Sequence, residues 1–141
     1  MVEMKSEPYT ITFGIIGAGR IGKLHADNLL SHVKGAKLKT VTDPFLDEEW
    51  AASRNIPETG KDHRIMLDDP EIDAILIGSP SPEHAAQMIE CARAGKHIFC
   101  EKPIALDPDI IRNALAEVEK SGVKLQVGFN RRFDPNFAAV Q

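Results

Sequence analysis

ITFGIIGAGRIG, at residues 11–22, joins a short apolar run to a glycine-rich turn and to the start of a helical pattern. Residues 11–16 are rich in β-branched side chains and too few for a helix, so we expect a strand that is buried on both faces. From Arg20 to Ser31 apolar residues recur at helical spacing, which predicts a helix directly after the turn. The G-x-G-x-x-G at residues 17–22 therefore lies in the strand–turn–helix context of a dinucleotide-binding turn.

Each glycine of this turn has a physical role in binding a pyrophosphate. The first permits a tight turn, the second lets the backbone approach the phosphates, and the third lets the helix pack on the strand. The helix N-terminus adds amide donors and the positive end of a dipole. The alternative is a chance glycine-rich turn, since the chain has 10 glycines. The cofactor-binding residues predicted here are Gly17, Gly19, Arg20, Ile21 and Gly22.

Strand and helix patterns alternate along the rest of the chain. We expect further strands at 37–42, 74–78, 97–100 and 124–129, and helices at 47–53, at 81–95 and from 107 onward. A strand at 55–60 contains proline and glycine, so it is expected to be short and at a sheet edge. Continuous apolar strands that alternate with helices predict an α/β fold, a doubly wound parallel sheet of the Rossmann type. We expect residues 1–130 to form this dinucleotide-binding domain.

The segment 131–141 begins another helix, because Asp134-Pro135 has the sequence of a cap residue followed by proline. Only about seven residues would follow the cap, which is short for a stable helix. We expect this segment to start a connection to a second, substrate-binding domain that the chain lacks. Phe133, Phe137 and Val140 would expose apolar surface, so we also expect the segment to dock on its own sheet or on a neighbouring copy, giving a homo-oligomer.

Composition excludes several classes of protein. The chain has 141 residues, of which 43% are hydrophobic, so it can bury a full core. Seventeen basic and 21 acidic residues give a net charge of −4 without any Lys/Arg block, so we predict no nucleic-acid partner. No apolar run approaches the roughly 18 residues of a membrane span, and residues 1–10 lack the apolar segment of a secretion signal. We therefore predict no membrane partner.

The cysteines and histidines indicate neither a disulfide scaffold nor a metal site. Cys91 and Cys100 are flanked by apolar or helix-forming residues, which suits reduced thiols of a core in a cytoplasmic protein. None of the five histidines pairs with another His, Cys or Asp at a spacing typical of metal ligands, so no metal is predicted.

Asp43 indicates which dinucleotide the turn would hold. It lies 21 positions after Gly22, at the end of the second predicted strand. An acidic residue at this place accepts hydrogen bonds from the adenosine ribose, whereas a 2′-phosphate would meet a like charge. The sequence therefore predicts NAD rather than NADP. The alternative is that Asp43-Pro44 is a turn or a helix cap.

Other polar residues follow strands, and the carboxyl ends of strands are where doubly wound sheets bind ligands. These residues include Ser79-Pro80, Glu101-Lys102 and Asn130-Arg131. Lys102, between a strand and a proline, could donate a hydrogen bond to a substrate hydroxyl or a ribose oxygen; the alternative is an ordinary surface lysine. His84, in the first turn of a helix after a strand, is either functional or structural.

Three motifs in order carry a family resemblance: the glycine turn at 17–22, Glu-Lys-Pro at 101–103 and GFNRRFDP at 128–135. Together they resemble the glucose-fructose oxidoreductase, inositol dehydrogenase and rhizopine catabolism protein family, over nearly the whole chain but only the amino-terminal half of the family's pattern. The motif at 128–135 is most similar to that of inositol 2-dehydrogenases. Sugar dehydrogenases of the family share similar sequences there.

The resemblance implies an oxidoreductase that transfers a hydride between NAD and a hydroxyl group of a polyol or sugar. Myo-inositol is a candidate substrate. The same resemblance implies that Lys102 is catalytic and also binds the cofactor, that Arg131 contacts substrate, and that the proton-accepting Asp and His of the family lie beyond position 141. Two other interpretations stay open: a free-standing NAD-binding or sensing module, and an oxidoreductase for another carbohydrate or a double bond. The other residues that the resemblance assigns to cofactor binding are Ser79, Pro80, His84, Glu101 and Asn130.

Overall fold

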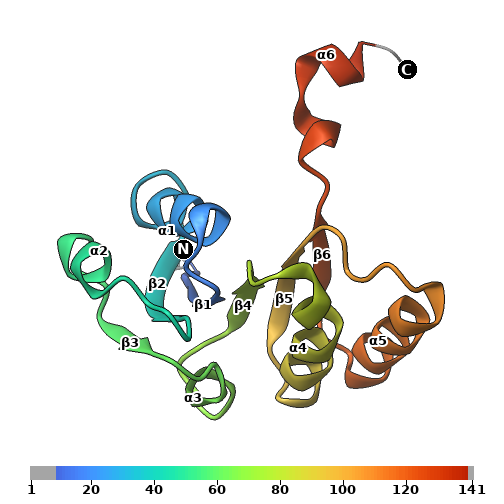
Figure 1. Cartoon of the computed structure of the whole chain (residues 1–141), viewed down its shortest axis with the longest axis horizontal. Helices are drawn as coiled ribbons and strands as arrows, with labels where there is room; N and C mark the ends of the chain where they lie inside the picture. The colour runs from blue at the N-terminus through green and yellow to red at the C-terminus, as the bar shows by residue number, and fades with distance from the viewer. Residues whose placement is uncertain (1–8, 140–141) are drawn as a thin grey trace, which may run out of the picture.

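The computed structural model describes residues 9–139. They form one six-stranded sheet in the order β3-β2-β1-β4-β5-β6, and every neighbouring pair is parallel (Figure 1). The strands are β1 (Ile11–Ile16), β2 (Ala36–Thr42), β3 (Glu58–Gly60), β4 (Ala74–Ile77), β5 (His97–Glu101) and β6 (Leu125–Gly128). The order reverses between β1 and β4, as in a doubly wound Rossmann sheet. The predicted fold class is confirmed, and the weak third strand lies at an edge.

Helices cover both faces of the sheet. They are α1 (Arg20–Ser31), α2 (Glu48–Ser53), α3 (Arg64–Leu67), α4 (Ser81–Arg93), α5 (Pro108–Ser121) and α6 (Pro135–Ala138), with a 3₁₀ turn η1 (Asn130–Phe133). Successive residues of β4 point to opposite faces: Ile75 and Ile77 pack with α4 and α5, whereas Leu76 packs with α1. Within residues 9–139 no helix is long and apolar enough to cross a membrane.

Residue types that suit helix ends lie at the ends of three helices. Asp107 accepts a hydrogen bond from the amide of Asp109 at the start of α5, and Asp134 caps α6 in the same way. Helix α5 ends at Gly122, which has a φ of 70°. Asn55, just past α2, has a φ of 52°, a conformation that Asn tolerates better than most residues.

Helix α3 was not predicted from the sequence. It has four residues and no side-chain cap, so no local signal marks it. Its position depends on Met66, which is fully buried against β1. A Cβ on Gly14 of β1 would lie 2.4 Å from the Met66 sulfur, so the absence of a side chain at Gly14 makes room for α3.

The expectation that the carboxyl-terminal segment docks on its own sheet is wrong for the described residues. Figure 1 shows η1 and α6 leading away from the end of β6. Phe133 is 76% exposed and Phe137 is 50% exposed. The segment packs on itself instead, with the Arg131 guanidinium 5.0 Å from the ring centre of Phe137. Val140 lies outside the described residues, as do the first eight residues of the predicted domain.

A buried lysine stabilises the edge of the sheet opposite the carboxyl ends of the strands. Lys96, just before β5, is 7% exposed, and its ammonium donates to the carbonyl oxygens of Asp69 (2.5 Å) and Ile72 (2.9 Å). These carbonyls belong to the loop between α3 and β4. Lys96 therefore links that loop to β5.

We expect Lys96→Met to lower the free energy of unfolding by roughly 2–4 kcal/mol, because two carbonyl oxygens would lose their donor. Lys120→Met, at an exposed position of α5, is the matched control and is expected to change stability by less than about 0.5 kcal/mol. Urea unfolding followed by circular dichroism measures both. Equal stabilities of the two variants would contradict the structural role of Lys96.

Candidate functional site

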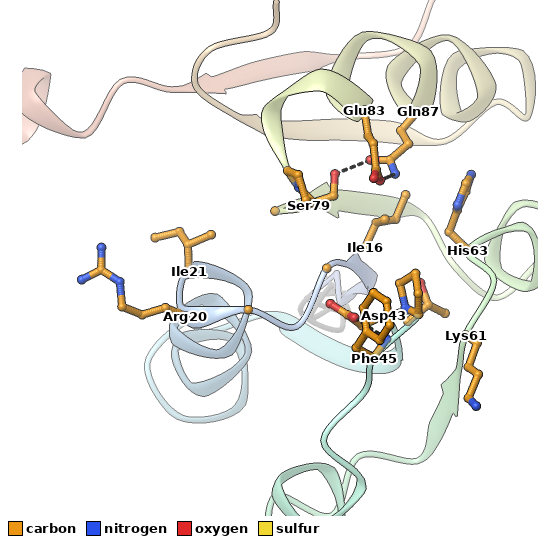
Figure 2. A pocket seen from close by; sticks show the side chains of 16 residues that line it. Ile16, Arg20, Ile21, Asp43, Phe45, Lys61, His63, Ser79, Glu83 and Gln87 are labelled. Atoms are coloured by element: carbon orange, nitrogen blue, oxygen red, sulfur yellow. Dashed lines mark hydrogen bonds between the residues drawn. The ribbon is translucent and has the colours of Figure 1, made fainter.

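A cleft of about 490 Å³ lies at the carboxyl ends of β1, β2 and β4, where the strand order reverses. Figure 2 shows its walls: Arg20 and Ile21 at the start of α1, Asp43 and Phe45 after β2, Ser79 after β4, and Glu83 and Gln87 in the first half of α4. The predicted residues that line it are Gly17, Gly19, Arg20, Ile21, Asp43, Ser79 and Pro80. Seven of the predicted site residues, from three separate segments, therefore meet in one place.

The three glycines of the turn have three different surroundings. A Cβ on Gly17, whose φ is 93°, would lie 2.7 Å from the carbonyl oxygen of Gly78. A Cβ on Gly22 would lie 1.9 Å from the carbonyl oxygen of Gly17. A Cβ on Gly19 would meet nothing within 4 Å, and Gly19 lines the cleft. The first and third glycines are thus required by close packing, and the second leaves space for a ligand.

The N-terminus of α1 faces this space. Gly19 is its cap residue, and no side chain accepts hydrogen bonds from its first turn. The first helical hydrogen bond runs from the Lys23 amide to the Gly19 carbonyl oxygen, at 2.9 Å. Amides before Lys23 have no acceptor inside the helix, so they are available to an anion.

Asp43 is fixed by two backbone amides. One carboxylate oxygen accepts from Ala18 at 2.7 Å and the other from Phe45 at 2.8 Å. The bond to Phe45 makes a local turn, as the alternative interpretation of Asp43-Pro44 expected, but the cap of α2 is Asp47, which accepts from Trp50. The bond to Ala18 links Asp43 to the glycine turn. Each carboxylate oxygen keeps a lone pair for a further donor.

The opposite wall of the cleft contains a chain of polar side chains that the sequence did not predict. The Ser79 hydroxyl donates to the side-chain oxygen of Gln87 at 2.5 Å, and the Gln87 amide donates to Glu83 at 3.0 Å (Figure 2). Glu83 and Gln87 are four residues apart near the start of α4, so they share one helix face. That spacing, directly after a strand end, was the available signal.

Glu101 does not line the cleft. Its carboxylate lies 2.6 Å from Nε2 of His25 on α1, and both side chains are about one-fifth exposed. A Cβ on Gly128 would lie 3.1 Å from the Glu101 oxygens, so the glycine at the end of β6 leaves room for this carboxylate. The contact between Glu101 and His25 therefore links α1 to the end of β5, where β5 pairs with β6.

His84 is also absent from the cleft lining, because it is buried beneath it. Its side chain is among the largest that are fully buried, with 1% of the residue exposed. Nδ1 lies 2.7 Å from the Pro103 carbonyl oxygen and Nε2 lies 2.7 Å from the Ser79 carbonyl oxygen. The ring thus bridges the loops that follow β4 and β5.

The remaining predicted residues lie at a second, smaller hollow. Lys102, Phe129, Asn130 and Arg131 line about 330 Å³ at the ends of β5 and β6. Lys102 is exposed. The cationic side chains of Lys102 and Arg131 and the side-chain amide of Asn130 thus border one hollow. This arrangement can donate hydrogen bonds to a polar ligand.

The described residues supply neither a reactive cysteine nor a cluster of metal ligands. Burial raises the pKa of the Cys91 and Cys100 thiols to about 12, so neither forms a thiolate near neutral pH. Both cysteines are free. Among residues 9–139 no three His, Cys, Asp or Glu side chains gather as metal ligands do.

Comparison with known proteins matches residues 11–129 to the family described as "Oxidoreductase family, NAD-binding Rossmann fold". An uncharacterized oxidoreductase of Bacillus subtilis, YrbE, is 50% identical over 93% of the chain and 39% of its own length. The scyllo-inositol 2-dehydrogenase (NAD(+)) of the same organism is 40% identical over 92% of the chain and 39% of its own length. The chain thus spans about two fifths of these relatives.

A solved structure agrees with this match. The scyllo-inositol dehydrogenase of Lactobacillus casei, crystallised with NAD(H) and scyllo-inositol, superposes with a TM-score of 0.85 at 36% identity. The superposition covers 93% of the chain and 39% of that enzyme. The surroundings of the three glycines fit a dinucleotide: two pack against backbone, and the third borders open space beside the uncapped helix N-terminus.

The glycine surroundings predict opposite effects of two substitutions. Gly19→Val is expected to lower the free energy of unfolding by only about 1 kcal/mol, the cost of a poorer helix cap, because nothing within 4 Å opposes its Cβ, but to weaken NAD binding about tenfold or more by filling the ligand space. Gly22→Ala is expected to lose about 3 kcal/mol of stability by overlap with Gly17. Urea unfolding and calorimetric titration measure the two effects. Undiminished NAD binding by Gly19→Val would show that the phosphates do not lie on this turn.

Proposed function

The chain belongs to this NAD-binding Rossmann-fold oxidoreductase family, and from that premise we propose that it forms the cofactor domain of a dehydrogenase acting on a polyol or sugar hydroxyl. The observation that carries the proposal is the glycine turn, in which packing demands Gly17 and Gly22 while Gly19 borders an open cleft next to Asp43. The names of two relatives, which are inositol dehydrogenases, support the substrate class. The substrate we propose is an inositol, with myo-inositol and scyllo-inositol as the candidates.

The residues of the cleft have distinct roles in this proposal. The first-turn amides of α1 donate to the pyrophosphate, and Arg20 and Ile21 border it. Asp43 accepts hydrogen bonds from the adenosine ribose through the lone pairs that Ala18 and Phe45 leave free. Ser79 and Pro80 border the cofactor from the end of β4.

The second hollow holds the reacting end in this proposal. When bound, NAD supplies the acceptor of the hydride. Lys102 donates a hydrogen bond to the reacting hydroxyl and to the nicotinamide ribose, Asn130 binds on the cofactor side, and Arg131 contacts substrate. Their shared lining of one hollow at the ends of β5 and β6 supports this division.

The domain boundaries, location and assembly are part of the same proposal. Residues 1–130 bind the cofactor, and residues 131–141 begin the connection to a substrate domain. The exposed Phe133 and Phe137 support an apolar contact with further protein, including another copy in a homo-oligomer. The two free buried cysteines suit a cytoplasmic protein.

Dehydrogenase relatives favour this proposal over a free-standing NAD-binding or sensing module. A different carbohydrate substrate would use the same cofactor cleft. The substrate side therefore has to be tested by activity, and the cofactor side by binding.

We expect the chain to bind NAD about tenfold or more tightly than NADP, because the Asp43 carboxylate would repel a 2′-phosphate. Asp43→Asn removes that charge and is expected to bring the dissociation constants of NAD and NADP closer together. Asp47→Asn, at the cap of α2 outside the cleft lining, is the matched control and keeps the ratio. Calorimetric titration of the three proteins with both cofactors measures this. Equal or tighter binding of NADP by the parent would overturn the role of Asp43.

We also expect the 141-residue chain to bind NAD without oxidising myo-inositol or scyllo-inositol. The proton-accepting residues that the resemblance places beyond position 141 would be missing, and loss of a general base costs about a hundredfold to ten-thousandfold in rate. Absorbance of NADH at saturating NAD measures turnover, and calorimetry on the same sample shows that the cofactor is bound. Robust turnover would place the proton acceptor within these 141 residues.

A further inference from the structure

The loop that carries Lys102 has one hydrogen bond to the rest of the described chain. Residues 102–106 connect β5 to the cap of α5, and Leu106 within the loop is 92% exposed. Among residues 9–139, the loop's hydrogen bond is the one between the Pro103 carbonyl oxygen and Nδ1 of His84, at 2.7 Å. Ile104 and Ala105, further along the loop, pack against the core that α4 and α5 share with the sheet. The His84 ring is therefore the hydrogen-bonding partner nearest to Lys102 in this loop.

His84 itself is held firmly. It lies in the first turns of α4, is 1% exposed, and its other ring nitrogen is 2.7 Å from the Ser79 carbonyl oxygen. A carbonyl oxygen only accepts, so the bond to Pro103 requires the tautomer with a hydrogen on Nδ1. The ring lies between the two loops, one of which borders the cleft while the other bears Lys102.

We propose that His84 is a positioning residue that donates through Nδ1 to Pro103 and thereby holds Lys102 at the second hollow, with Asn130 and Arg131. It does not touch the ligand. The functional consequence rests on the proposed role of Lys102, whereas the tie between His84 and the loop can be tested without any ligand.

Two substitutions separate the two ends of the ring. The side-chain amide of Asn reaches the place of Nδ1, and the longer side chain of Gln reaches the place of Nε2. His84→Asn can therefore keep the bond to Pro103, and His84→Gln can keep only the bond to Ser79. If His84 merely filled volume, Gln would be the better replacement because it is larger.

The first measurement is ¹⁵N relaxation of the backbone amides of Lys102, Ile104 and Ala105 in the 141-residue chain, which reports how rigidly the loop is held. We expect their order parameters to fall by about 0.1 or more in His84→Gln relative to the parent, and to stay at the parent's values in His84→Asn. His97→Asn, at the opposite end of β5, is the control and is expected to leave these amides unchanged. The ¹⁵N spectrum of His84 in the parent is expected to show a hydrogen on Nδ1.

The second measurement is calorimetric binding of NAD and of AMP, which carries only the adenosine half. We expect His84→Gln to weaken NAD binding about fivefold and to leave AMP binding unchanged, because Lys102 would act at the nicotinamide half. His84→Asn is expected to keep both affinities.

Three results would overturn the proposal: an Nδ1 without hydrogen, equal order parameters of the loop in both His84 variants, or a Gln variant whose loop is more rigid than that of the Asn variant. Equal losses of NAD and AMP binding would likewise show a general structural role. If the parent binds no NAD but the expected order parameters are found, the role of His84 in holding the loop stands and the proposed function fails. If the parent binds NAD and the order parameters do not change in His84→Gln, the proposed function stands and the role of His84 fails.

Discussion

Helix α1 approaches the turn after β1 so closely that no side-chain atom fits on Gly22, where a Cβ would lie 1.9 Å from the Gly17 carbonyl oxygen. The same approach brings α1 against the end of β4, since a Cβ on Gly78 would lie 3.5 Å from the Cα of Gly22. The Asp43 carboxylate binds the Ala18 amide and joins the end of β2 to the turn. One close contact between a helix and a turn thus sets the positions of three strand ends, and the cleft is the space that they leave.

The parts of this arrangement that depend on local signals were predictable from the sequence. Buried parallel strands need apolar side chains on both faces, and the runs at 11–16 and 74–77 have them. Asp107 and Asp134 cap their helices through their own side chains, so the residue type and the following proline mark the helix start. The glycine turn was predictable because each glycine answers a backbone requirement at a fixed offset.

The parts that depend on contacts between distant residues were not predictable. Glu101 and His25 are 76 positions apart, and their pairing follows from the order of the strands rather than from either residue's neighbours. The Glu-Lys-Pro motif predicted that Glu101 matters, but it did not indicate that the carboxylate turns toward α1. Helix α3 is a similar case, since the burial of Met66 depends on Gly14 in a strand far back in the sequence.

The two ends of the site differ in how they are held. At the glycine turn, the backbone of Gly17 donates to Thr42 and that of Gly78 donates to Ile16, each at 2.8 Å, so the sheet itself fixes the turn. Lys102, in contrast, lies on a loop with one hydrogen bond to the rest of the described chain, and the packing of that loop on the core comes later, at Ile104 and Ala105. Lys102 borders a hollow with Phe129, which is 55% exposed. Hydride transfer requires a reacting end from which water is excluded. For the activity that we propose, the cofactor end is therefore built by this fold alone, whereas the reacting end requires further protein to cover Phe129 and to order Lys102.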